Sequence, residues 1–492
     1  MTIDYVSILK TERLRSEATS GATLSTESEA DRSRVIFSPA FRRLQQQAQL
    51  FSLGSHAAVR SRLSHALQVA QVGRAIAGRI AAGLATEGRA DGETYAALLN
   101  FVETACLMRD IGSPPFGRAG EAAVRNWFAD HGPEHMRAAS IAYGARDLEA
   151  RDPRVLNALV DFYQFHEVAQ GLRVLGKLHW HGVSGGMNLT KTSMATYLRY
   201  LSMSGGDSVM GQGQFTGHAG FFSTEAGLVK NIWSAFGYSA ADPRRFPLTY
   251  VVEAANRITA TFGDLEDAVN MGLVDAHQAW QTIRDDWLST YIPIDPDEAD
   301  EKIMEILGHA IENPASSFAS TRATLFNAMA DYAARSYLSL QPEAFSGKLD
   351  SLLSATSGSG VLISVVENYC AKKVYALDSL QDQALDGYKV VYSLFQQFSG
   401  LLAISAQRFQ AALKSVADKS AADASLFLER QLLALVPVEC RGAYTQLVAQ
   451  VSGRDQEFEE WNARAHLIVD FIAGLSDSAA LTTFRRLAAI DL

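Results

Sequence analysis

The residues with the clearest chemical potential lie in one stretch, 105–121, which reads Ala-Cys-Leu-Met-Arg-Asp-Ile-Gly-Ser-Pro-Pro-Phe-Gly-Arg-Ala-Gly-Glu. An apolar run ends there in the ionisable pair Arg109-Asp110, and two prolines then turn the chain. A carboxylate can hold a divalent cation, whereas a guanidinium has only hydrogen-bond donors and pairs with anions such as phosphate. These residue types at one turn indicate a polar site for a metal ion or a phosphate group.

The elements that must position this site are helices. Apolar residues recur at three- and four-residue spacing over 69–80, which predicts an amphipathic helix with His65 in its first turn or just before it. A second helix is expected over 93–108. Because the two prolines cannot continue that helix, the pair Arg109-Asp110 is predicted at its C-terminal end, and Glu121 at the start of the next helix.

The same period runs through most of the chain and strand-like alternation is rare, so the predicted class is all-α. Further helices are expected over 155–177, 248–271, 301–312, 363–417, 425–435 and 463–475. The glycine-rich stretch 202–223 is the exception, and it is expected to form a flexible loop or lid.

Composition places the chain among globular proteins, because 48% of its 492 residues are hydrophobic and 20% are charged. It shows no signal-peptide pattern and no apolar run of membrane-spanning length, so we expect a cytoplasmic protein that does not enter a membrane. A net charge of -10 argues against overall attraction to nucleic acid, although a local basic patch can still bind it. The three cysteines are widely spaced and are expected to be buried free thiols.

A series of motifs, in order along nearly the whole chain, resembles the bacterial deoxyguanosine triphosphate triphosphohydrolase (dGTPase) family of the HD superfamily. The motifs are Asp31-Arg-Ser-Arg-Val-Ile36, Ser38-Pro-Ala-Phe-Arg-Arg-Leu-Gln45, Val59-Arg-Ser-Arg-Leu-Ser-His65, the stretch 105–121, Arg245-Phe-Pro-Leu-Thr249, Asp264-Leu-Glu-Asp-Ala-Val269, Gly387-Tyr388 and Phe484-Arg-Arg-Leu487. The resemblance implies an HD-domain-like helical fold with additional C-terminal helices. It also implies cleavage of a deoxynucleoside triphosphate to the nucleoside and inorganic triphosphate, with a divalent metal, by an oligomer.

The resemblance places four metal ligands, of which this sequence keeps two. His65 matches the first histidine and Asp110 the first aspartate, while Arg109 stands where the second histidine belongs. The family segment Glu-Ala-Ala-Asp-Asp-Ile reads Glu-Ala-Ala-Asn-Arg-Ile here, so Asn256 takes the place of the second aspartate and Arg257 follows it. An arginine cannot coordinate a cation, so no cofactor is expected; Mg, Mn or another divalent metal would be required only by an active enzyme.

The catalytic positions implied by the resemblance are altered as well. Arg118 replaces a histidine expected to act on the attacking water or leaving oxygen, whereas Glu121 is kept. The family segment Phe-Glu-Gly-Asn-Ala-Gln resembles residues 165–170, which places His166 at a polar pocket position beside Glu167. An ordinary hydrogen-bonded pair is the simpler interpretation of those two neighbours.

Residues that would hold a nucleotide survive better. The resemblance assigns Gln49 to the sugar, Arg62 to a phosphate, and Tyr200 and Asp264 to the same pocket, whereas a tyrosine that packs against the nucleotide is replaced by Ala260. We interpret Arg109, together with Arg118 and Arg257, as fixed positive charges in place of the metal. His179 and His181 lie two residues apart, which would send them to different faces of a helix, and do not predict a second metal site.

The predicted organisation has three segments. Residues 1–33 would be a mobile N-terminal segment, because 18–33 is rich in Ser, Thr, Ala and Glu, with order beginning near Arg34. Residues 34–275 would form an HD-like nucleotide-pocket domain, and residues 276–492 a helical region for packing and assembly.

Three functional hypotheses follow. The leading one is a catalytically inactive dGTPase-like protein that binds a deoxynucleoside triphosphate or another phosphate-bearing ligand and acts as a regulatory subunit, as a homo-oligomer or with an active paralogue. The alternative is an active metal-dependent triphosphohydrolase with a rearranged site that uses His65, Asp110, Glu121 and His166 or Glu167. The third is a protein that binds single-stranded nucleic acid.

Overall fold

A computed structural model describes residues 5, 7–16, 22–51, 59–139, 153–178, 185–205, 218–291, 298–313, 318–417, 423–453 and 456–490. The first half contains helices α1 (Leu24–Ile36), α2 (Pro39–Arg43), α3 (Arg62–Thr86), α4 (Gly92–Met108), α5 (Arg118–Ala138), α6 (Pro153–Tyr163), α7 (Glu167–Arg173), α8 (Lys191–Tyr197), α9 (Ala226–Ser234) and α10 (Thr249–Asn270). The second half contains α11 (Ala276–Thr290), α12 (Glu298–Glu312), α13 (Phe318–Ser339), α14 (Gln341–Ser346), α15 (Gly358–Lys373), α16 (Asp378–Phe398), α17 (Gly400–Ala403), α18 (Ala406–Ala417), α19 (Phe427–Leu435), α20 (Val438–Gln450), α21 (Gln456–Ala473) and α22 (Asp477–Leu487).

The all-α prediction is confirmed. Short helices η1 (Leu44–Gln46), η2 (Val174–Leu178), η3 (Ser223–Glu225) and η4 (Ala424–Leu426) complete the helical part. The strands within the described ranges are β1 (Ser202–Met203) and β2 (Ala219–Phe221), which pair in parallel. These strands occupy the two ends of the predicted glycine-rich loop, whose residues 206–217 lie outside the described ranges.

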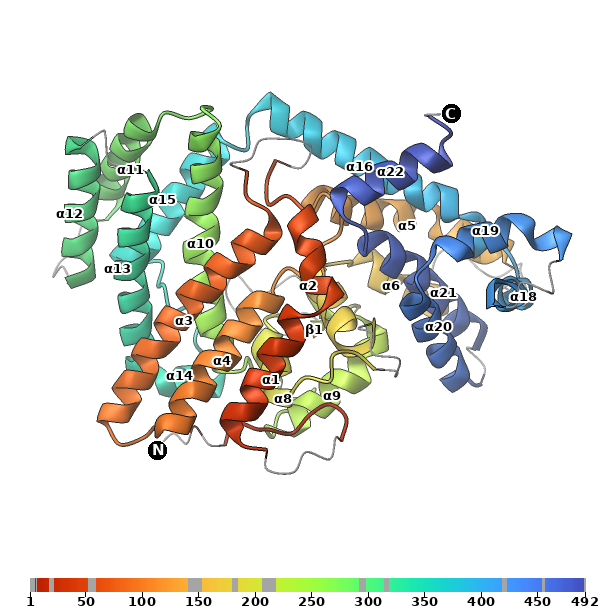
Figure 1. Ribbon diagram of the computed structural model, residues 1–492, viewed down its shortest axis with the longest axis horizontal. Coiled ribbons are helices and arrows are strands. Elements are labelled where there is room, and N and C mark those ends of the chain that lie inside the picture. The colour runs from red at the N-terminus through yellow and green to blue at the C-terminus, as the bar shows by residue number, and fades with distance from the viewer. Residues whose placement is uncertain are drawn as a thin grey trace.

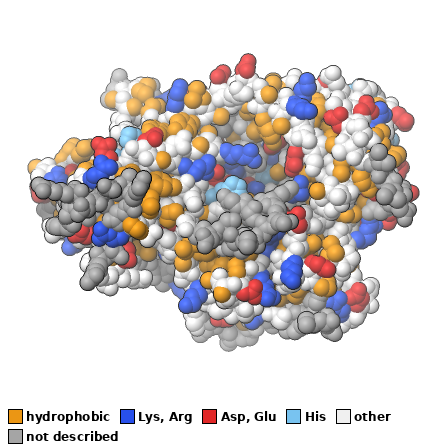
Figure 2. All heavy atoms as spheres, turned by 180° about the vertical axis from the view of Figure 1, so that it is seen from behind, with side chains coloured by type: hydrophobic (Ala, Val, Ile, Leu, Met, Phe, Trp, Pro, Cys, Tyr) orange, Lys and Arg blue, Asp and Glu red, His pale blue; other side chains and the backbone are white. Residues whose placement is uncertain are grey.

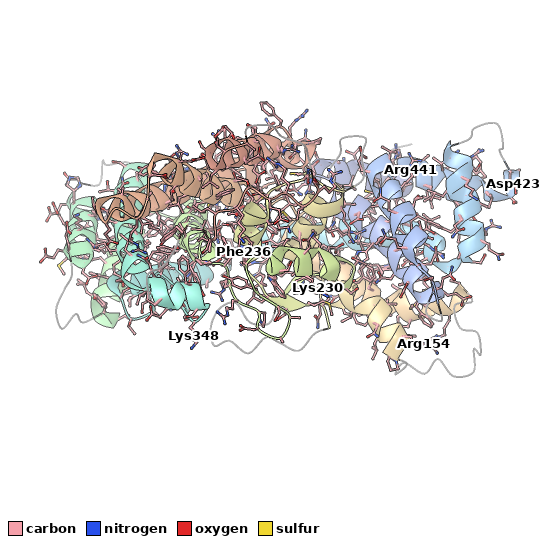
Figure 3. The ribbon with its side chains drawn as sticks, turned by 90° about the horizontal axis from the view of Figure 1, so that it is seen from below. Arg154, Lys230, Phe236, Lys348, Asp423 and Arg441 are labelled. Carbon is pink, nitrogen blue, oxygen red and sulfur yellow. The ribbon has the colours of Figure 1, made fainter. Side chains whose placement is uncertain are left out.

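The helices surround two hydrophobic clusters that do not follow chain order. In the first, α3 packs against α4, α10 and α13, and the helices α11, α12 and α15 join it. In the second, α5 packs against α6 and α16, and α21 packs against α6 and α20. Figure 1 shows α10–α15 on one side of the molecule and α16–α22 on the other. From below, Lys348 lies in the half of the first cluster, and Asp423 and Arg441 lie in the half of the second (Figure 3). The packing therefore does not divide at residue 275.

The helices around the central motif form where the sequence predicts them. The Ser61 side chain caps α3 by accepting a hydrogen bond from the Ser64 amide, which places His65 in the first turn. Helix α4 ends at Met108, so the pair Arg109-Asp110 follows its last turn, as predicted. The two helices approach closely, because a Cβ on Gly73 of α3 would lie 2.6 Å from Cys106 Sγ of α4.

The turn between α4 and α5 is held by distant parts of the chain. Arg43 of α2 donates to the carbonyl oxygens of Ile111 and Ser113 in the turn, and to those of Ala473 and Leu475 at the end of α21 and just after it. The Asp477 carboxylate at the start of α22 accepts from the Phe116 amide at 2.9 Å. The C-terminal helices therefore fix the backbone on which the site is built.

The prediction that order begins near Arg34 is wrong for residues 24–33, which belong to α1. The Thr23 and Thr26 side chains cap this helix reciprocally, and its polar composition conceals a buried contact. Asp31 is fully buried, where it pairs with Arg13 at 2.7 Å and accepts hydrogen bonds from Thr190 and Ser193. Composition misled because these polar side chains pair inside the protein.

Cys106, Cys370 and Cys440 are buried and free, as predicted. The helix expected over 363–417 is broken between α15 and α16 and again before α18. Among the described helices, none alone is long and apolar enough to cross a membrane; α21 and α22 meet that limit only as a pair bent by 112°.

Candidate functional site

A cavity of about 1190 Å³ lies where the two hydrophobic clusters meet. The predicted site residues that line it are Gln49, Arg62, Arg109, Arg118, Glu121, His166, Glu167, Tyr200, Asn256, Arg257, Ala260 and Asp264. On the face seen in Figure 2, basic and histidine side chains gather around a hollow near the middle. The structure therefore brings almost all of the predicted set to one cavity, although His65 and Asp110 are buried in its floor and do not line it.

The floor of the cavity contains Asp110, to which the resemblance assigns a metal, and the arginines beside it. The Arg109 Nη1 atom lies 2.5 Å from Asp110 Oδ1, and Arg62 Nη1 lies 3.9 Å from the same oxygen. Asp110 is fully buried, while Arg109 is held between it and the cavity. A guanidinium therefore neutralises the aspartate that a metal would otherwise contact.

The remaining donors do not fit the metal that the resemblance implies. Both ring nitrogens of His65 are buried without a hydrogen-bond partner among the described residues, and burial lowers the pKa of this imidazole to about 4. Such a neutral ring could donate a lone pair, but Arg109 cannot coordinate a cation, and Asn256 offers a neutral amide oxygen where the resemblance expects a carboxylate. Within the described ranges, no group of three or more His, Cys, Asp or Glu side chains is placed to hold a metal ion.

Above this floor, Glu167 lies among arginines. Its Oε1 accepts from Arg199 at 3.2 Å, and its Oε2 accepts from the Ser113 hydroxyl at 2.5 Å. The Ser113 hydroxyl in turn accepts from Arg62 at 3.0 Å. Although burial alone would raise the pKa of Glu167, the charges of Arg109, Arg199 and Arg62 hold it well below its usual range. Glu167 is therefore an ionised carboxylate in a ring of guanidinium groups.

The pKa of the neighbouring carboxyl group, Glu121, is shifted in the opposite direction to that of Glu167. Glu121 accepts from the Glu167 amide at 2.7 Å, and Arg125 lies 3.6 Å away on the same helix face. Burial, followed by the charge of Glu167, raises the pKa of Glu121 to about 7. The pKa values of two neighbouring carboxyl groups are thus displaced in opposite directions, a property of many acid–base sites.

His166 and Glu167 bond to different partners, so the expected pairing of these neighbours is wrong. The His166 Nδ1 accepts from the Val168 amide at 3.2 Å and caps α7, which leaves the proton of the neutral ring on Nε2. Burial lowers the pKa of His166 to about 3. The His166 ring lies 5.2 Å from that of Tyr200 and 4.6 Å from that of His218, between ring centroids.

Another wall of the cavity is formed by α10 and α15. The Asp264 Oδ2 accepts from the Tyr375 hydroxyl at 2.6 Å, and burial raises the pKa of this carboxyl. Arg257 lies 3.8 Å from Glu367, so it faces a carboxylate of α15 rather than Asp110. Arg118 is exposed on the cavity wall.

Sequence reasoning missed Arg125, Ser113, His218, Glu367 and Tyr375. Arg125 could have been found, because it lies four residues after Glu121 on one helix. Tyr375 and Glu367 come from a part of the chain far from any site motif, and only the fold brings them in. His179 and His181 lie outside the described residues.

No family model matches the chain. The alignments with three curated relatives span 94% of this chain and 94% of each relative. The chain is 31% identical over 490 residues to a deoxyguanosinetriphosphate triphosphohydrolase of Enterobacter sp. (strain 638). It is 30% identical over 488 residues to the protein of that name in Cronobacter sakazakii (strain ATCC BAA-894), and 30% identical over 492 residues to that in Klebsiella pneumoniae.

Proposed function

Because the chain belongs to the deoxyguanosinetriphosphate triphosphohydrolase family, we propose that it is a nucleotide-binding member that no longer performs the metal-dependent hydrolysis. The observation that carries this proposal is the contact between Arg109 and Asp110 at 2.5 Å. A divalent metal at Asp110 would have to displace a fixed positive charge. Of the four expected ligands it would then find one imidazole and one carboxylate, with the neutral amide of Asn256 in place of the second carboxylate, which is a weaker set than that of a typical catalytic metal site.

Loss of the metal would remove two contributions to phosphate hydrolysis, the polarisation of a phosphoryl oxygen and the activation of water. Arg118 cannot replace the proton-transfer role of a histidine, because a guanidinium stays protonated. Of Arg118 and Glu121, the two positions on the helix that follows the central turn, only Glu121 can move a proton. The residues present therefore favour binding over turnover.

Binding itself is supported by the charges on the cavity wall. Arg62, Arg109 and Arg199 face the cavity around one carboxylate, and their planar forks suit phosphate oxygens. Tyr200, His166 and His218 supply aromatic surface beside these arginines, against which a nucleobase can stack. A nucleotide could thus be held at both ends without a metal.

One observation favours the active alternative. Glu121 and Glu167 have pKa values displaced in opposite directions, as a general acid and base would. An active enzyme would use these groups with a metal held at His65 and Asp110. Assembly with a second copy or an active paralogue, and binding of single-stranded nucleic acid, stay predictions that light scattering and salt-dependent binding assays can test.

The deciding experiment incubates the protein with dGTP and each of the other deoxynucleoside triphosphates, with Mg²⁺ or Mn²⁺, and measures released triphosphate. We expect none above the level of the Asp110→Ala variant, and elemental analysis of the purified protein should find no stoichiometric transition metal. Turnover that Asp110→Ala abolishes, with about one metal per chain, would establish the active alternative.

A further inference from the structure

We infer that Glu167 is an internal anion that occupies the arginine cluster of Arg62, Arg109 and Arg199, and that a phosphate-bearing ligand binds by displacing this carboxylate. The inference rests on the proposed function and identifies the residue that sets the strength of anion binding at that site. In this role Glu167 competes with the ligand for the arginines. It neither binds a metal nor transfers a proton.

The contacts of the carboxylate are those that a phosphate would make. One oxygen takes a hydrogen bond from Arg199 at 3.2 Å, and the other takes one from Ser113 at 2.5 Å and lies 3.9 Å from Arg62. Charged guanidinium and neutral hydroxyl donors are the groups that bind phosphate oxygens in proteins. The Glu167 side chain keeps 19% of its surface exposed, so it faces the cavity and can be exchanged from there.

The backbone of Glu167 is fixed, which confines the competition to the side chain. Its amide donates to Glu121 at 2.7 Å, and a Cβ on Gly112 would lie 2.0 Å from its carbonyl oxygen. The close approach of these backbones leaves α7 no room to move toward the central turn. Rotation about the side-chain bonds is therefore the simplest way for the carboxylate to leave the cluster.

The charge balance shows why displacement matters. Arg62, Arg109 and Arg199 carry three positive charges, against which Asp110 and Glu167 place two negative charges in direct reach. With Glu167 in place, an incoming polyanion meets a cluster with one net positive charge and, within it, a like charge. With Glu167 turned away or neutral, two positive charges are available, so the cluster attracts the ligand much more strongly.

The test compares Glu167→Gln with the wild-type protein, by titration calorimetry in EDTA with inorganic tripolyphosphate and with dGTP. The amide keeps the size and a hydrogen-bond acceptor but removes the charge, so both ligands should bind about tenfold more tightly or better. Glu429→Gln is the matched control. It removes a largely buried carboxylate that pairs with Arg408 at 2.6 Å away from the cavity lining, and it should change affinity by less than about threefold.

Glu167→Ala gives a second route if Glu167→Gln does not fold. It removes the competing carboxylate but keeps Arg199 and the Ser113 hydroxyl as donors to the ligand, and it should also tighten binding. Wild-type binding without a gain in either variant would overturn the inference while the proposed function stands. Absence of binding in all three proteins would overturn both, whereas an equal gain in Glu429→Gln would show a general effect of net charge and overturn the inference.

Discussion

Arg173, at the end of α7, and Arg109, directly after α4, both pair with an aspartate that is almost or fully buried, yet their surroundings differ. Every guanidinium nitrogen of Arg173 donates a hydrogen bond, to Asp470, Glu225 or Thr224. Around Arg109, by contrast, Asp110 Oδ2 and both nitrogens of His65 are buried without a partner among the described residues.

The difference separates a structural ion cluster from a site. The Arg173 cluster is closed, because its donors and acceptors match one another and none of its members lines the large cavity. The Arg109 group borders that cavity and keeps unpaired polar atoms, each of which costs free energy unless water or a ligand reaches it. Buried polar atoms without hydrogen-bond partners beside a cavity therefore indicate a group that binds a ligand.

The largest effect should come from the closed cluster. Arg173→Met would leave Asp470 and Glu225 buried without their partner, which should lower the free energy of unfolding by about 3–5 kcal/mol. Arg109→Ala should cost less, about 1–2 kcal/mol, because cavity water can solvate Asp110. Denaturant unfolding of the two variants checks this order, and equal losses would remove the distinction between the clusters.

A ligand should stabilise the folded protein through the Arg109 group, which borders the cavity, and not through the Arg173 cluster. In EDTA, a nucleotide at 100 times its dissociation constant should add about 2.7 kcal/mol to the native state. Arg109→Ala should reduce this shift, whereas Asp110→Asn should spare or increase it, because it removes a repelling charge beside the arginines. Thermal unfolding with dGTP measures the shift, and guanosine without phosphates is the control.

His65 gives the comparison a pH dependence. The pKa of its imidazole is lowered to about 4 in the folded protein. Below about pH 6.5 the unfolded chain therefore binds a proton at this residue, whereas the folded chain stays unprotonated there until the pH approaches 4. This contribution to stability is present above pH 6.5 and is lost as the pH falls toward 4. Between pH 7 and 5 the loss should be about 2 kcal/mol.

His65→Gln should remove that loss, so the difference in unfolding free energy between wild type and variant is the quantity to measure. Glu121 acts with the opposite sign, because its raised pKa of about 7 favours the folded state at low pH. Since Glu121 is present in both proteins, its effect cancels in the difference. A pH-independent difference would show that the ring of His65 is hydrated rather than buried.

The smallest effect is expected at Tyr375. Tyr375→Phe removes the hydrogen bond to Asp264 at the cavity wall and should cost about 1 kcal/mol. A double-mutant cycle with Asp264→Asn isolates the coupling between the two side chains. A cost as large as that of Arg173→Met would mean that this wall, too, belongs to a closed cluster.

The sequence permitted accurate prediction where local chemistry decides structure. The prolines after Asp110 limit how far α4 can extend, and the periodicity before Ile80 defines α3, so the placement of His65 and Arg109 could be foreseen. Tertiary contacts decided the rest. Nothing local to Ser113 shows that its hydroxyl bridges Arg62 and Glu167, and nothing local to Asp31 shows that it is buried.

The interleaving of the two hydrophobic clusters has a consequence for the timing of folding during translation. Phe128 of α5 and Phe162 of α6 leave the ribosome early, yet their cluster is completed by Phe395 and Trp461 far downstream. At about 5–20 residues per second, this interval is on the order of tens of seconds. Throughout it, a growing chain carries an apolar surface without its cover, so nascent and C-terminally shortened chains should depend on chaperones to avoid aggregation.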